Sequence, residues 1–339
     1  MPWGMDVGVD TRPAQNDSIL AFVTPKGGLA AVRRSDGSTK WLAPGSWRGS
    51  ENVLIAGGSV VVTLDTVHAF DLQTGEKRWS YWAGESARFG TATTAGNTIY
   101  ITTRDWRLVA LDANSGDALW ERSLRDSLAG LPRLVSATVG GDTVYATVQQ
   151  KYSEANGLTV LMIFAIDRSD GRVLFKMQEG TYTDFIGYVQ RPTIAGRLLI
   201  MPHTLSNRLT AYDRFTGRVA WRMFSEAGWG GFLGKPALAG GVIYASSGDR
   251  RVYAVNATSG AVLWKSAILN GSQDEATVCG PFVFSWAGLR TIVLNRATGK
   301  QVGVLDAGLD ASRSYSVAPL TDGTDAFVMS VREVRRFTC

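Results

Sequence analysis

The stretch Ala110-Leu111-Asp112-Ala113-Asn114-Ser115-Gly116-Asp117-Ala118-Leu119-Trp120 decides the fold. An apolar strand ends in Asp112, a turn ends in Gly116, and an aromatic residue follows the glycine at a fixed distance. Clean copies of this arrangement run through Gly75 to Trp79, Gly217 to Trp221 and Gly260 to Trp264, and looser ones are anchored by Gly37/Trp41, Gly171/Phe175 and Gly299/Gly303. A period of about forty residues with four short strands per unit predicts a β-propeller.

Each residue type in the repeat has a mechanical role. The Asp or Asn side chain can accept backbone N–H bonds from the turn, and the glycine supplies the positive φ that the turn needs. The aromatic residue after the turn is expected to pack as a wedge between neighbouring blades. The row of aligned carboxylates is therefore interpreted as structural rather than catalytic.

Counting strands gives eight blades in one domain that spans residues 1–339. After Gly303 the chain supplies only three further strands, near Ala318, Phe327 and Val334. Residues near Trp3 are expected to provide the missing fourth strand, so that the N-terminus joins the last blade. Such closure removes open sheet edges, which otherwise invite aggregation.

Composition excludes several classes of protein. The 339 residues carry 35 basic and 30 acidic side chains, a net charge of +5 with no basic run, which argues against nucleic-acid binding. No apolar stretch is long enough to span a membrane, and the N-terminus lacks the features of a signal peptide. With only Cys279, Cys339 and two histidines, neither a disulfide framework nor a Cys- or His-based metal site is expected. We expect a monomer with two free thiols, although a bridge between them stays open.

The repeat Ala-x-Asp-x-x-(Thr/Ser)-Gly-x-x-x-Trp resembles the tryptophan-docking repeat of the pyrroloquinoline-quinone-like β-propeller family over essentially the whole chain. It departs from the pattern at Arg33, Phe175 and Gly303. The family includes quinoprotein dehydrogenases, BamB-like assembly lipoproteins and bacterial sensor domains. The resemblance implies a vicinal cysteine pair where a quinone cofactor binds. Here Cys279 and Cys339 are far apart, so we expect no cofactor, and the resemblance to the non-enzymatic, BamB-like members remains.

Propeller geometry places the loops between second and third strands, and those between blades, on one face. That face is rich in tryptophan and charge, and exposed aromatic clusters with polar neighbours often mark binding surfaces. Loop packing is the alternative for each tryptophan. The candidate residues are Trp82 and Trp229 (with Trp47) in loops between blades, Trp106 and Trp286 in loops within blades, and Arg104, Asp105, Arg107, His203, Asp249 and Arg250 beside them.

A second candidate site lies at the mouth of the central channel. Alignment on the turn glycines places Arg12, Arg191, Lys235 and Glu275 at equivalent positions of first strands. A charge network that seals the channel is the favoured interpretation. The functional alternative is a pocket for an anion or carboxylate, in which Arg191 and Lys235 donate hydrogen bonds and Glu275 orients them.

Neither a catalytic constellation nor a metal site emerges from the sequence. We therefore predict a non-catalytic binding, scaffolding or ligand-sensing propeller module from a bacterium, which binds a protein or a small anionic or polar ligand on the loop face. The alternative is an enzyme acting on a small organic or sugar-like substrate at the charged, tryptophan-lined face. A long polar loop is expected at residues 149–157 of blade four. We expect an extracytoplasmic location if a targeting region is missing, and a cytoplasmic one otherwise.

Overall fold

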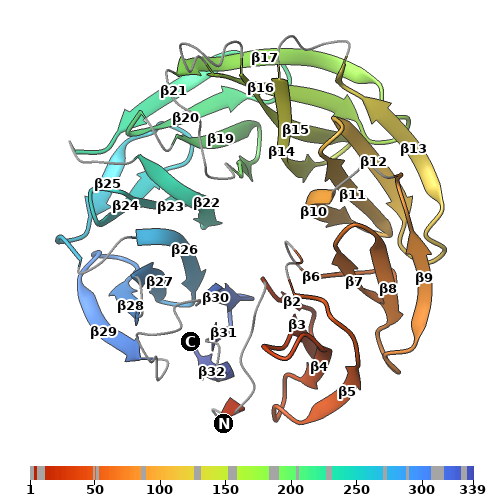
Figure 1. The fold of residues 1–339 in the computed structure, drawn as a ribbon. Helices are drawn as coiled ribbons and strands as arrows, with labels where there is room; N and C mark the ends of the chain where they lie inside the picture. Colours follow the sequence, from red (N-terminus) through yellow and green to blue (C-terminus); the bar gives the residue numbers. More distant parts are fainter. Residues whose placement is uncertain are drawn as a thin grey trace. The chain divides into compact units, whose positions relative to one another are not determined.

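The fold is all-β, and its strands form the eight four-stranded antiparallel blades of a β-propeller, as the repeat predicts. Figure 1 labels most of these strands and colours them along the sequence. The computed structural model describes residues 4–5, 12–48, 50, 53–84, 89–125, 131–151, 159–182, 191–203, 206–226, 231–269, 273–287, 290–306, 317–329 and 334–339. It divides into two compact units, an N-terminal unit of residues 10–189 and a C-terminal unit of residues 1–9 with 190–339.

The N-terminal unit holds blades 1 to 4. Blade 1 is β2 (Ala14–Gln15), β3 (Ile19–Val23), β4 (Leu29–Arg33) and β5 (Thr39–Ala43). Blade 2 is β6 (Val53–Ala56), β7 (Ser59–Thr63), β8 (Val67–Asp71) and β9 (Lys77–Tyr81). Blade 3 is β10 (Phe89–Ala95), β11 (Thr98–Thr103), β12 (Arg107–Asp112) and β13 (Ala118–Ser123). Blade 4 is β14 (Leu131–Gly140), β15 (Thr143–Lys151), β16 (Thr159–Asp167) and β17 (Val173–Tyr182).

The C-terminal unit holds blades 5 to 8. Blade 5 is β18 (Thr193–Ala195), β19 (Leu198–His203), β20 (Arg208–Asp213) and β21 (Val219–Phe224). Blade 6 is β22 (Phe232–Ala239), β23 (Val242–Ser247), β24 (Arg251–Asn256) and β25 (Val262–Lys265). Blade 7 is β26 (Gln273–Cys279), β27 (Phe282–Ala287), β28 (Arg290–Asn295) and β29 (Gln301–Asp306). Blade 8 is β30 (Val317–Thr321), β31 (Asp325–Met329), β32 (Val334–Thr338) and β1 (Gly4–Met5).

The turn between third and fourth strands has the chemistry that the repeat predicts. In blade 2 one carboxylate oxygen of Asp71 accepts the backbone N–H groups of Gln73 and Thr74, at 2.8 and 2.9 Å. Gly75 closes the turn with a φ of 77°, a conformation that costs a residue with a Cβ but not glycine. The backbone hydrogen bond from Thr74 first, and that from Gln73 next, lower the pKa of Asp71, and the charge of Arg78 adds to them.

Tryptophans of the fourth strands pack on the turn of the following blade. The Trp79 ring lies so close to Gly116 that a Cβ there would be 2.6 Å from it, and the Trp79 indole N–H donates to the Ala113 carbonyl at 3.0 Å. The turn glycine is therefore required twice, for its φ and for the close approach of the ring. The same contact joins Trp41 to Gly75, Trp120 to Gly171, Trp221 to Gly260 and Trp264 to Gly299.

The core lies between neighbouring blades rather than within one sheet. The second and third strands of blades 1 to 7 are mostly buried, and alternate residues of a strand point to opposite faces of its sheet. Between blades 3 and 4, for example, Tyr100 and Leu108 pack with Val144 and Phe164. Between blades 6 and 7, Tyr244 and Ala254 pack with Val283. Neighbouring blades within a unit thus share an apolar core.

Blade 8 is closed by both ends of the chain, as the strand count predicts. Gly4 pairs with Arg335 and Met5 with Val334, so β1 is the edge strand of this blade. Trp3 lies outside the described residues.

The expectation of two free thiols is wrong, because Cys279 and Cys339 form a disulfide. Cys279 ends the first strand of blade 7 and Cys339 follows β32, and the Cα atoms are 5.6 Å apart. Their separation in sequence hides a proximity that arises only when blade 8 packs beside blade 7.

The insertion of blade 4 begins later than predicted. Residues 149–151 continue β15 and pair with β16, so the extra length of this blade goes first into longer strands. The rest of the predicted loop, residues 152–157, lies outside the described residues.

Candidate functional site

The loop between β11 and β12 presents Trp106 from an unusual backbone conformation. The Trp106 N–H donates to the Thr103 carbonyl at 3.3 Å, which closes a tight turn, and Trp106 itself has a φ of 67°. A bulky residue in this region costs roughly 1–2 kcal/mol relative to ordinary backbone. Gly or Asn would adopt this conformation at lower cost, so the presence of tryptophan here indicates a role for the ring.

Arg107 fixes this loop to the segment that enters blade 3. Its guanidinium pairs with Asp105 at 2.8 Å and with Glu121 at 2.7 Å, and donates to the Ala83 carbonyl at 2.6 Å. The hydrogen bond to Asp105 is the first cause of the raised pKa of Arg107. Tyr81 donates its hydroxyl to Glu121, and burial first and this hydrogen bond next raise the pKa of Tyr81. The two loops are therefore held together by charged groups that are already paired.

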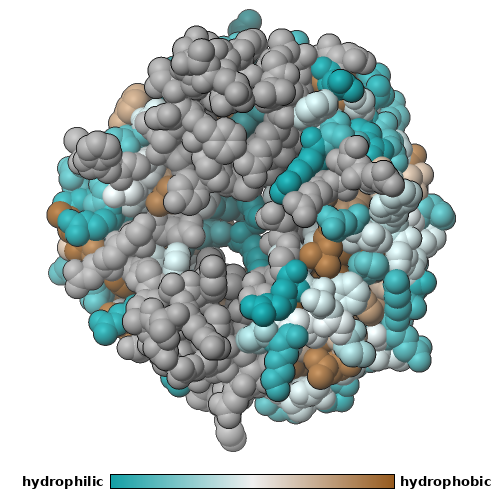
Figure 2. Space-filling view, viewed as in Figure 1, coloured by the Kyte–Doolittle hydropathy of each residue, from teal (hydrophilic) through white to brown (hydrophobic). Residues whose placement is uncertain are grey.

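Four side chains belong to the loops beside this anchor, and we call them the Trp82–Trp106 surface: Trp82, Arg104, Trp106 and Arg125. Trp82 precedes the tethered Ala83, and 62 % of it is exposed. Trp106 is half-buried, with the Arg125 guanidinium 5.2 Å from its ring centroid. Arg104 is exposed on the same loop. On the face that Figure 2 displays, small groups of hydrophobic residues stand among hydrophilic ones.

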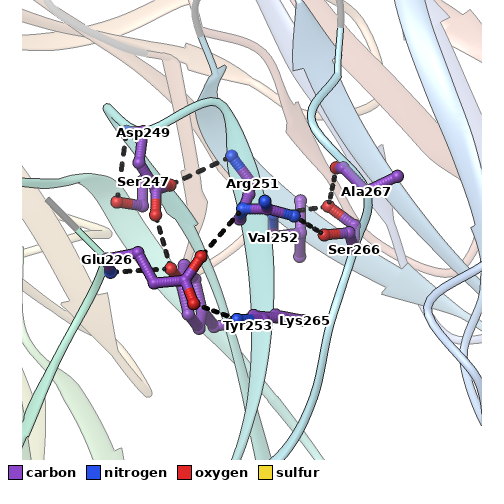
Figure 3. A network of polar contacts seen from close by, with 9 residues as sticks. All are labelled: Glu226, Ser247, Asp249, Arg251, Val252, Tyr253, Lys265, Ser266 and Ala267. Carbon is purple, nitrogen blue, oxygen red and sulfur yellow. Dashed lines mark hydrogen bonds and ion pairs between the residues drawn. The ribbon is translucent and has the colours of Figure 1, made fainter. Parts of the chain in front are cut away.

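Blade 6 of the C-terminal unit repeats this turn, and Figure 3 shows the polar contacts that Asp249 and Arg251 make there. Arg250 has a φ of 64° and closes a turn on the Ser247 carbonyl at 3.0 Å, as Trp106 does on Thr103. The next residue, Arg251, pairs with Glu226 at 3.5 Å and donates to the Ser266 carbonyl at 2.5 Å. Asp-x-Arg therefore builds the same turn in blades 3 and 6, with the middle residue presented in the left-handed region.

Two further contacts complete the blade 6 network (Figure 3). Glu226 pairs with Lys265, and this hydrogen bond is the largest cause of the lowered pKa of Glu226. The Tyr253 hydroxyl donates to Asp249 and accepts the Glu226 N–H at 3.0 Å. Burial, followed by the hydrogen bond to Asp249, raises the pKa of Tyr253. These groups neutralise one another, so the network serves to hold loops rather than to transfer protons.

Several predicted site residues lie elsewhere than expected. His203 is not on an open face: it ends β19 and is fully buried. Trp286 is not in a loop, because it belongs to β27 and pairs with Thr291. Trp47 packs its ring on His68 and Phe70, with centroids 5.0 and 5.2 Å away, so it is a packing residue. Trp229 lies outside the described residues.

The four predicted channel residues have distinct environments. In the C-terminal unit Arg191 is half-buried before β18, Lys235 is exposed on β22, and Glu275 on β26 is only 8 % exposed. Arg12 belongs to the N-terminal unit, where its carbonyl accepts the Val53 N–H at 2.8 Å. All four engage in interactions within the protein. Lys235 and Glu275 each lie where the strand register shifts by a bulge, a device that re-aims side chains.

Sequence reasoning missed the partners that build these loops. Arg125, Tyr81 and Glu121 in blades 2 and 3, and Glu226 and Lys265 around blade 6, had no signal in the repeat itself. The recurring Asp-x-Arg between second and third strands would have indicated the anchor. Among the described residues no group of three or more His, Cys, Asp or Glu side chains is placed to hold a metal ion. In the same part of the chain, no helix has the length and apolar character to cross a bilayer.

These strands, turns and interblade contacts define a β-propeller of tryptophan-containing repeats. A family model described as "Outer membrane protein assembly factor BamB" matches residues 26–177 and 162–331, and the chain belongs to this family. A solved structure of BamB from Moraxella catarrhalis has the same fold, with a TM-score of 0.75, 17 % identity, and coverage of 99 % of this chain and 98 % of that one.

Two relatives found by sequence have different functions by name, one a hydrolase and the other an assembly factor. Tetrathionate hydrolase of Acidithiobacillus ferrooxidans is 21 % identical over 296 residues, which cover 78 % of this chain and 56 % of the hydrolase. Outer membrane protein assembly factor BamB of Yersinia pestis is 29 % identical over 131 residues, covering 34 % of this chain and 33 % of that protein. The matches thus span only part of both relatives, and one of the two is an enzyme by name.

Proposed function

We propose that this propeller is a non-catalytic binding or scaffolding module that docks a protein partner on the Trp82–Trp106 surface. The observation that carries the proposal is the left-handed backbone of Trp106, whose ring is presented beside Arg125 on a loop that Arg107 holds in place. Trp and Arg are the residues most often found at the energetic centres of protein interfaces. The membership of an assembly-factor family supports a role in protein assembly.

Rigid presentation favours binding over catalysis. The carboxylates nearest the surface, Asp105 and Glu121, are both paired with Arg107. A general acid or base needs a group that is free to exchange a proton with a substrate. The surface instead offers aromatic area and two cations, which suit contact with another protein. A platform that is already ordered also lowers the entropy cost of association.

An extracytoplasmic location follows from the same proposal. Disulfides persist in oxidising compartments and are rare in the cytosol, and Cys279 is bonded to Cys339. The related BamB of Yersinia pestis is named an outer membrane protein assembly factor, which fits such a location.

The test is site-specific photo-crosslinking in the native host. A benzoylphenylalanine placed at residue 82 or 106 is expected to capture one defined partner. Phe215 is the matched control, because it is 51 % exposed and flanked by Arg197 and Arg214 in the same way but lies in a turn between third and fourth strands. Capture at 215 equal to that at 82 and 106, or capture at none of them, would contradict the proposal.

A backbone-matched pair of variants then tests the role of the ring. Trp106→Gly suits the observed φ, so its effect on folding stability is expected to stay within about 1 kcal/mol while affinity for the captured partner falls at least tenfold. Arg250→Gly makes the same backbone change in blade 6 and is expected to leave that affinity unchanged. Equal loss in both variants would indicate a general effect on the fold.

A hydrolase is the second candidate function, and the match to tetrathionate hydrolase over 78 % of this chain favours it. Tetrathionate consumption by the purified protein, abolished by substitution of Arg191 or Glu275 but retained in Trp106→Gly, would establish this alternative. It would also displace the binding proposal.

A further inference from the structure

A groove lies between blades 6 and 7, wholly within the C-terminal unit, and shares no residue with the Trp82–Trp106 surface. Its volume is about 400 Å³, within the usual range for small-molecule sites. Leu263 and Trp264 of β25 and Tyr244 of β23 form its apolar wall, and Arg296, Gly280 and Pro281 of blade 7 form the other side.

Arg296 is the polar group of this groove, and its orientation is fixed. Its Nε donates to the Tyr244 hydroxyl at 3.1 Å, one terminal nitrogen donates to the Gly280 carbonyl at 3.2 Å, and the guanidinium lies 5.8 Å from the Tyr244 ring centroid. The side chain is half-buried, yet among the described residues no carboxylate forms an ion pair with it. A Cβ added at Gly240 would lie 2.9 Å from the second terminal nitrogen, so the glycine leaves room beside it. A held cation without a counter-ion is thus available to an anion.

The opposite wall is apolar and rigid. The rings of Tyr244 and Trp264 lie 5.9 Å apart at 47°, and the Trp264 indole N–H donates to the Arg296 carbonyl at 2.9 Å. Leu263, the neighbour of Trp264, is 53 % exposed at the rim. A ligand that meets Arg296 with an anionic end therefore meets these apolar side chains with the rest of its body.

Blades 3 and 4 of the N-terminal unit carry a copy of these side-chain contacts, with one change of residue. Tyr100 and Trp120 have the same ring arrangement, 5.9 Å apart at 43°, and Arg168 donates to the Gly141 carbonyl at 3.2 Å, as Arg296 does to Gly280. The residue after this glycine is Pro281 in blade 7 but the exposed Asp142 in blade 4. The copy thus places a carboxylate at the rim, which disfavours an anionic ligand.

We propose that the groove between blades 6 and 7 binds amphipathic carboxylates, with the carboxylate on Arg296 and the apolar body against Leu263 and Trp264. Arginine is suited to planar, paired hydrogen bonds with carboxylates, and the bond is stronger at a partly buried site. This site does not depend on the Trp82–Trp106 surface, which lies in the other unit.

The experiment follows the indole N–H signal of Trp264 by ¹⁵N–¹H NMR, assigned with a Trp264→Phe variant, during titration with 3-phenylpropionate. A saturable shift is expected, and the neutral analogue 3-phenylpropan-1-ol is expected to bind at least roughly tenfold more weakly. Arg296→Gln should lower the affinity for 3-phenylpropionate by at least about tenfold. Arg168→Gln, the matched change in blade 4, should leave this affinity unchanged.

Two outcomes would overturn the proposal: no saturable shift of Trp264 up to about 10 mM ligand, or equal binding of acid and alcohol. If Arg296→Gln fails to fold, Pro281→Asp replaces it, because this change installs the carboxylate of the copy without touching Arg296. It is expected to weaken binding severalfold, and unchanged affinity would also contradict the assignment.

Discussion

The boundaries on the two sides of blade 7 solve the same packing problem by different means. Toward blade 6, Trp264 packs on Gly299 and its indole donates to the Arg296 carbonyl at 2.9 Å. Toward blade 8, Gly303 stands at the position of the tryptophan, and Cys279 is bonded to Cys339.

Chain topology accounts for the difference. A docking tryptophan needs the turn between third and fourth strands of the next blade. Blade 8 has no such turn, because its third strand β32 is followed by Cys339 and its fourth strand β1 comes from the other end of the chain. A tryptophan at position 303 would have no turn glycine to cover. The disulfide of Cys339 connects the two blades instead. Blade 8 also approaches blade 7 closely here, because a Cβ added at Gly280 would lie 3.2 Å from the Cβ of Cys339.

Removing the covalent link is expected to have the largest effect. The Cys279→Ala/Cys339→Ala variant should lose about 4 kcal/mol of unfolding free energy, since the bond closes a loop of 60 residues in the unfolded chain. Chemical denaturation checks this value. Reductant should destabilise the wild type by a similar amount and leave the variant unaffected; a variant as stable as the oxidised wild type would show that packing alone holds blade 8.

The Trp264→Ala change breaks the other boundary and is expected to cost about 3 kcal/mol, because the ring loses its packing on Gly299 and leaves a cavity. The Trp264→Phe variant keeps an aromatic ring but removes the indole N–H. It should therefore lose about 1 kcal/mol of unfolding free energy, for the hydrogen bond to the Arg296 carbonyl. Unfolding curves in denaturant measure both. Identical losses in the two variants would mean that the apolar ring contributes little.

Restoring the tryptophan of the repeat at position 303 should add almost nothing to the stability of the fold. Gly303→Trp is expected to change stability by less than about 1 kcal/mol, because the ring has no turn on which to pack. Thermal unfolding beside the wild type gives the comparison. A clear stabilisation would reveal a docking surface on blade 8 that the topology does not provide.

The smallest expected effect concerns the turn residue, which is Asp213 in blade 5 but Asn256 and Asn295 in blades 6 and 7. Desolvation acts to raise the pKa of Asp213, but the hydrogen bonds from Arg197, Phe215 and Thr216 outweigh it and lower the pKa to about 2. A lowered folded-state pKa stabilises the protein above the unfolded pKa near 4, and this contribution is lost as pH falls toward 2. Stability curves of Asp213→Asn and wild type should therefore converge between pH 4 and 2; parallel curves would contradict the assignment.

The repeat was predictable because its signals are local. Asp112, Gly116 and Trp120 lie within one turn and its flanking strands, so their spacing alone indicates the structure. The closure by β1 followed from counting strands. The disulfide did not, because Cys279 and Cys339 approach each other only after two blades have packed.

The loop positions of the candidate residues were predictable in part for the same reason. Trp82, Trp106 and Arg104 were placed correctly because they fall in loops that the strand pattern delimits. Trp286 and His203 were misplaced because β27 and β19 extend farther than the pattern indicates. Arg296 carried no signal, since its reach to Tyr244 joins two blades.

The pairing of β1 with β32 also sets an order of events during synthesis. Residues 4 and 5 leave the ribosome long before their partners, residues 334 and 335. At about 5–20 residues per second, the interval is on the order of tens of seconds. Throughout it, blade 8 cannot form, and the flank of blade 7 that carries Cys279 stays open to solvent and to chaperones.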